Sequence, residues 1–167
     1  MQSFRVFIAA VIVILLALPL YFSSQNLVLT NRSTGEILFA QPVQDGIKFS
    51  IKFIHSVNQS PVAEIFEIRQ NQITLVSLEF EDFGAGMPTE LEQGQSLTHL
   101  PDGRLQIDGF DRTMSELRYM VGHAADLVLY IEQKRIPLNQ LAEPGTLIEF
   151  EIRRLRPWDA IPTLAAF

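Results

Sequence analysis

The sequence contains no cysteine, which excludes disulfide bridges and also excludes a thiol-linked lipid anchor. Stability must therefore come from an apolar core. Basic residues are also scarce, because 13 lysines and arginines face 19 acidic residues and the net charge is −6. The densest basic stretch is Arg153, Arg154 and Arg156. This balance argues against nucleic acid or an anionic membrane surface as a partner.

Several catalytic signatures are missing as well. The chain lacks a G-x-S-x-G nucleophile elbow, an H-E-x-x-H zinc motif, a phosphate-binding loop and a dinucleotide fingerprint. His99 and His123 have no spacing typical of metal ligands. We therefore predict a binding protein rather than an enzyme, with no cofactor, no metal site and no catalytic residue assigned.

The one long hydrophobic run lies at the N-terminus, where residues 6–22 include no charged side chain. Arg5 precedes this run, as in a signal peptide or a signal anchor. The residues that follow lack an A-x-A cleavage pattern, which favours an uncleaved anchor. We expect residues 1–25 to hold a single-pass protein in a bacterial inner membrane with its domain facing the periplasm, or to release it there if they are cleaved.

The rest of the chain reads as one β-domain at residues 26–156, followed by an irregular C-terminal tail at residues 157–167. Short apolar runs recur between turn-forming residues at a spacing of about 8–12 residues, which is typical of all-β proteins. Residues 47–53 alternate between apolar and polar, as in a half-buried strand. We predict about eight to ten strands in an antiparallel β-sandwich or a small barrel, preceded by one N-terminal apolar helix.

Turn-forming pairs between these runs predict hairpins. Gln70-Asn71 separates two strand-like runs, and asparagine tolerates the positive φ that a two-residue turn requires. Similar hairpins are expected around residues 101–103 and 133–134.

Residues 111–122 are ambiguous. They read either as one short helix that begins at Asp111 and ends at Gly122, or as a strand around residues 117–121. The sequence alone leaves both alternatives open.

Pairing the first three strands as a meander places polar side chains at one end of an otherwise apolar face. With residues 56–61 as the loop, His55 would lie opposite Val62, and Phe53 would lie opposite Glu64. Continuing through the next turn adds two more residues to this face. The four polar residues gathered there are then His55, Glu64, Ser77 and Glu79.

An imidazole and two carboxylates placed in this way could converge on one small ligand or on a partner. The glycine-containing loop at residues 83–88 would hang over the same end, since its glycines permit close backbone approach. The predicted ligand-binding or partner-binding residues are His55, Ser56, Glu64, Glu79, Phe83, Gly84, Gly86 and Pro88. A structural alternative stays open, in which His55 is hydrogen-bonded at a strand end and Glu64 satisfies backbone donors.

Three segments carry a resemblance to a known family: FSIKFIHSVNQSPVAEIFEI, LEFEDFGAGMP and MVGHAADLVLYIEQKRIPLNQLAEPGT. Their H-S-V, P-V-x-E and F-G-A-G-x-P motifs include His55, Glu64 and Gly84. Over residues 27–152 the chain resembles a small bacterial family of unknown function. The resemblance implies a gene beside TAXI-type TRAP transporter permeases, and hence an accessory role in solute uptake. Ser77 stands where that family usually has an acidic residue.

We therefore expect a membrane-anchored accessory protein that contacts a TRAP-type permease or its solute-binding protein through the end of the domain that carries His55. The alternative is an independent module that binds a small solute or a divalent cation, with the two carboxylates as hard ligands. A hydrolase with His55 as base and Glu64 as its orienting group is a third hypothesis, for which the sequence offers no identifiable nucleophile.

Overall fold

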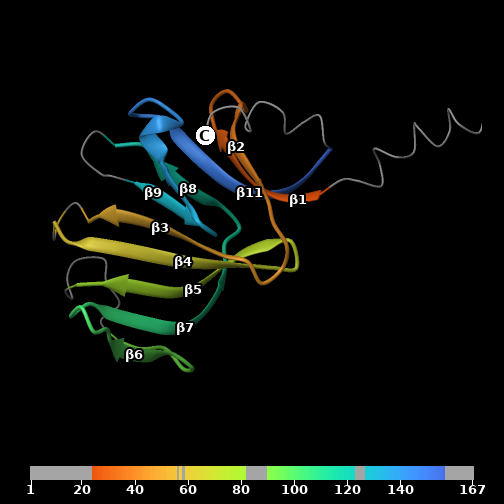
Figure 1. Cartoon of the computed structure of the whole chain (residues 1–167). Helices are drawn as coiled ribbons and strands as arrows, with labels where there is room; N and C mark the ends of the chain where they lie inside the picture. The colour runs from red at the N-terminus through yellow and green to blue at the C-terminus, as the bar shows by residue number, and fades with distance from the viewer. Residues whose placement is uncertain (1–23, 56, 58, 82–89, 123–126, 157–167) are drawn as a thin grey trace, which may run out of the picture.

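The computed structural model describes residues 24–55, 57, 59–81, 90–122 and 127–156. These residues form two antiparallel sheets (Figure 1). In spatial order, the four-stranded sheet contains β2 (Ile37–Pro42), β1 (Ser24–Asn31), β11 (Leu147–Leu155) and β8 (Leu117–Met120). The seven-stranded sheet contains β10 (Lys134–Pro137), β9 (Val128–Ile131), β3 (Lys48–Ile54), β4 (Pro61–Arg69), β5 (Gln72–Phe80), β7 (Leu105–Thr113) and β6 (Ser96–His99).

The prediction of an all-β domain is confirmed. Neither sheet closes on itself, so the small barrel that the strand spacing also allowed is not formed. Within the described ranges the only helical element is the 3₁₀ turn η1 (Leu138–Gln140), and none of these residues forms a helix long and apolar enough to cross a membrane. The predicted N-terminal helix and the C-terminal tail lie outside the described residues.

The two sheets pack against each other through one apolar core. Phe49 of β3 stacks on Phe66 of β4, with ring centroids 5.2 Å apart. Phe49 also stacks with Phe150 of β11 in the other sheet, at 6.4 Å between centroids. Burial of each such ring stabilises the fold by roughly 1.5–3 kcal/mol. These aromatic contacts therefore hold the four-stranded sheet on the seven-stranded one.

The hairpin between β4 and β5 forms where the sequence predicts it. Gln70 and Asn71 both have positive φ, at 50° and 64°. Two consecutive residues of this kind make the turn whose twist matches that of the flanking strands. The hairpins expected around residues 101–103 and 133–134 are also present, as β6–β7 and β9–β10.

The ambiguous stretch at residues 111–122 contains no helix. Asp111 belongs to the end of β7, and β8 pairs with β11 at the edge of the four-stranded sheet. Leu117 and Tyr119 alternate with Arg118 along β8, and the first two pack against the core. Residues 117–120 therefore form a strand rather than a helix, because β11 pairs with them and the core covers their apolar side chains.

The first and last described strands of the domain are neighbours. β1 pairs with β11 along its whole length, from Ser24 opposite Leu155 to Asn31 opposite Ile148. Consequently the two ends of the described domain lie side by side, as Figure 1 shows at the start of β1 and the end of β11.

Candidate functional site

The loop between β3 and β4 is shorter than the sequence analysis assumed. The His55 amide donates a hydrogen bond of 2.9 Å to the Ser60 carbonyl, so antiparallel pairing extends almost to the loop. Glu64 therefore lies opposite Ile51 rather than opposite Phe53. The predicted register of these two strands is wrong by two residues. An even shift preserves the side-chain alternation, and Glu64 stays on the inner face.

A β-bulge in β5 overturns the predicted grouping of the polar residues. Ile65 of β4 pairs with Ser77, and Val76 is left out of the register. One extra residue reverses the alternation of the side chains beyond it. Ser77 and Glu79 therefore lie on the outer face of the sheet, and the prediction that they share a face with Glu64 is wrong.

His55 closes the β3–β4 loop. Its side chain is half-buried, and its Nδ1 accepts a hydrogen bond of 3.3 Å from the Val57 amide. Its backbone pairs with Ser60, so the predicted position opposite Val62 is wrong. These contacts support the structural role that the sequence analysis left open. The other predicted residues of this end lie outside the described residues: Ser56, Phe83, Gly84, Gly86 and Pro88.

Glu64 forms a polar link between the two sheets. It points inward from β4, and its carboxylate accepts a hydrogen bond from the hydroxyl of Tyr119 on β8. The Tyr119 ring packs edge-on against Phe150 at 5.6 Å and lies 6.4 Å from Phe53. A carboxyl group in these apolar surroundings has a single side-chain donor among the described residues.

Burial dominates the electrostatics of this pair. It raises the pKa of Glu64 above its ordinary value of 4.5, and the hydrogen bond from Tyr119 offsets part of the rise. Burial and the neighbouring Glu64 carboxylate also raise the pKa of Tyr119. No group of three or more His, Asp and Glu side chains in the described part of the chain could hold a metal ion. The pair therefore suits a structural or proton-holding role better than a metal site.

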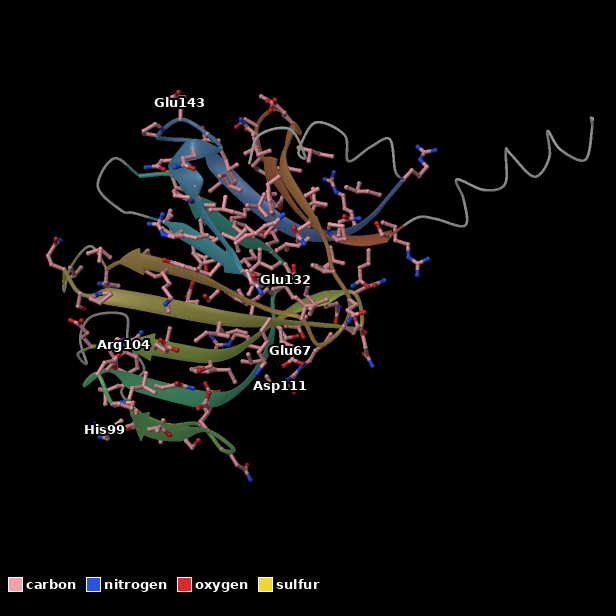
Figure 2. The ribbon with its side chains drawn as sticks, viewed as in Figure 1. Glu67, His99, Arg104, Asp111, Glu132 and Glu143 are labelled. Carbon is pink, nitrogen blue, oxygen red and sulfur yellow. The ribbon has the colours of Figure 1, made fainter. Side chains whose placement is uncertain are left out.

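The outer face of the seven-stranded sheet carries an open groove of about 360 Å³. It runs over β4, β5 and β7, and Ile65, Ser77, Glu79, Gln106 and Asp108 are among its lining residues. We call it the outer groove. An adjacent hollow of about 490 Å³ shares Glu67 and Arg69 with it. Figure 2 shows Arg104 at one end of these strands and Glu67 with Asp111 at the other.

Ion pairs line both ends of the outer groove. Arg104 bonds the Glu79 carboxylate and, at 2.8 Å, that of Asp102. At the other end Arg69 bonds Glu67 at 3.0 Å and Asp111 at 3.1 Å. The centre differs, because Asp108 there accepts hydrogen bonds of 2.8 and 2.9 Å from the neutral Gln106 amide.

The residues predicted from the sequence did not include Asp108, Gln106 or Tyr119. Asp108 and Gln106 alternate with Leu105 and Ile107 along β7, and this alternation is the signal that places both polar residues on the outer face. Tyr119 alternates with Arg118 along β8 in the same way, but this alternation predicts an inward side chain only if residues 117–121 form a strand, and the sequence also allowed a helix there.

A model of a family described as a domain of unknown function, DUF1850, matches residues 49–138, more than half of the chain. The chain belongs to the DUF1850 family. The matched range runs from β3 to the first residue of η1, so the DUF1850 region includes Glu64, Tyr119 and every lining residue of the outer groove except Lys48. β1, β2 and β11 of the four-stranded sheet lie outside it. No curated protein and no solved structure matches the chain.

Proposed function

We propose that this DUF1850 protein is a membrane-anchored, periplasm-facing β-sandwich domain that acts by binding rather than by catalysis. Its role is that of an accessory protein of a TAXI-type TRAP transporter, in contact with the permease or its solute-binding protein. The apolar run at residues 6–22 supports the anchoring, and the resemblance described above supports the transporter. Anchoring raises the effective concentration of the domain around a membrane partner.

One observation carries the assignment of the contact surface. Ile54 and Val57, on either side of His55, expose 38% and 66% of their surface at the β3–β4 loop. Contiguous exposed apolar surface favours a protein contact, and these two side chains lie at the same loop. The partner would meet this loop. The predicted contact at residues 83–88 lies outside the described residues. Glu64 is not part of the surface, because it lies between the sheets.

Site-specific photocrosslinking tests this function in the full-length protein in its native membrane. One variant carries the photoreactive residue at position 57, and a matched control carries it at the exposed Gln72, at the far end of β5. We expect position 57 to capture the permease or the solute-binding protein of a TRAP transporter, identified by mass spectrometry, and position 72 to capture neither. Failure of position 57 to capture either protein would contradict the proposal.

An independent small-solute module is the second candidate. The outer groove favours it, because the groove is formed within this one chain and needs no partner to complete it. A divalent-cation site is less well supported, since the described residues bring no three metal-binding side chains together.

A further inference from the structure

The outer groove holds one carboxylate whose charge is not compensated. Glu79 is paired with Arg104. Glu67 is paired with Arg69, and that hydrogen bond, followed by nearby charges, lowers the pKa of Glu67. In the described part of the chain, Asp108 forms no ion pair and accepts only from the neutral Gln106 amide. Lys48 also lines the groove, but it is the register partner of Glu67 and lies at that end. The carboxylate at the centre, Asp108, is therefore the one without a cationic partner among the described residues.

A buried hydroxyl without a partner lies directly across from this carboxylate. Ser77 on β5 is the register partner of Asp108 on β7, so both side chains lie on the outer face. Directly opposite residues have Cβ atoms about 4.5–5.5 Å apart. Ser77 is only 5% exposed, and among the described residues its Oγ has no hydrogen-bond partner. A buried hydroxyl in this state is costly unless something bonds to it.

The floor beside these two groups is apolar. Ile65 is the register partner of Ser77 on its other side, and Val76 and Phe110 also line the groove. A ligand that fits the surface therefore combines a positive group, N–H donors and an aliphatic stem.

We propose that the outer groove binds a primary alkylammonium group, which donates hydrogen bonds to the Asp108 carboxylate and to Ser77 Oγ while its carbon chain lies on Ile65. Asp108 repels an anion, and a neutral alcohol leaves its charge uncompensated. A quaternary ammonium has no N–H to offer Ser77. The net charge of −6 attracts cations to the protein as a whole. This inference is independent of the proposed transporter role.

Titration of the full-length protein in detergent tests the proposal, with n-butylammonium as the probe. 1-Butanol and tetramethylammonium serve as neutral and quaternary controls. We expect saturable binding of n-butylammonium below about 10 mM, with much weaker binding of both controls. Asp108→Asn should weaken binding about tenfold or more, because it removes a charge-assisted hydrogen bond. Glu143 is an exposed carboxylate outside the groove (Figure 2). The control variant Glu143→Gln should therefore bind n-butylammonium as tightly as the original protein does.

Ser77→Ala provides a second variant that keeps the fold. It removes an unbonded buried hydroxyl, so thermal stability should not fall, whereas affinity for n-butylammonium should fall several-fold. Absence of saturable binding, or unchanged affinity in both Asp108→Asn and Ser77→Ala, would overturn the proposal.

A second probe, in competition with n-butylammonium, distinguishes a free amine from a lysine side chain of a partner protein as the source of the ammonium group. Nα-acetyl-lysine N-methylamide presents the same group as a lysine side chain within a peptide. Tighter binding of this compound than of n-butylammonium would assign the groove to a lysine of a partner protein. The opposite order would assign it to a free amine.

Discussion

Replacing Gly109 with alanine tests how closely β7 approaches the chain before β6. Gly109 lies in an irregular part of β7, next to Asp108, and has φ +90°. A Cβ atom at this position would lie 2.3 Å from the Gly94 carbonyl oxygen and 3.0 Å from the Gln95 Cα. The backbone at Gly94 would therefore have to move to admit the added methyl group.

The expected magnitude has two parts. A non-glycine residue held at positive φ costs about 1–2 kcal/mol. Forcing extra atoms against packed backbone costs about 1–3 kcal/mol more. Gly109→Ala should therefore destabilise the protein by about 2–5 kcal/mol. Gly103 is the matched control, because its φ is +91° and no atom lies within 4 Å of the Cβ that alanine would add. Gly103→Ala should cost only the first part.

Urea unfolding of both variants gives the comparison, read as midpoints at equal slope. Thermal unfolding gives a second reading, with about 2–4 °C expected for each kcal/mol in a chain of this size. Gly109→Ala should be the less stable variant by about 1–3 kcal/mol. Equal losses in the two variants would show that Gly94 does not approach Gly109 as closely as the structure places it.

Two further predictions concern the pair between the sheets. Tyr119→Phe removes the hydroxyl that bonds Glu64 and should lower the free energy of unfolding by about 1–3 kcal/mol, measured by urea unfolding at neutral pH; an unchanged midpoint would contradict the hydrogen bond. Glu64→Gln tests the raised pKa of Glu64. Because the folded protein favours protonated Glu64, that contribution to stability is fully present below pH 4.5 and is lost as pH rises through the folded pKa. Glu64→Gln should therefore gain stability relative to the original protein as pH rises above 4.5, and a difference that stays constant with pH would contradict this reasoning.

Much of the fold could be predicted from alternation and turn chemistry. The alternation at residues 47–53 gave β3, and Gln70-Asn71 gave the β4–β5 turn, because both signals are local. The register between strands depends on where a loop closes. Residues 55–60 offer several equally polar closing points, so the pairing of Glu64 with Ile51 could not be read from them.

The error at the candidate site has a physical cause that is visible in the sequence afterwards. Ile73 and Leu75 are apolar at one phase of the alternation, whereas Leu78 and Phe80 are apolar at the other. This change of phase is the signature of a bulge between them. If the alternation kept one phase along the whole of β5, Ser77 and Glu79 would point inward. Because the phase changes at the bulge, both point outward, toward the outer groove.

The pairing of β1 with β11 also has a consequence for biogenesis. The first strand of the domain gains its second neighbour only when the last strand has been synthesised. Pairing at such sequence separation is slow, since a long loop has to close before the contact forms. The buried apolar residues Leu27 and Leu29 of β1 lack this cover in every shorter nascent chain. The domain therefore cannot finish folding before β11 has been synthesised, and until then the apolar side chains of β1 are open to aggregation.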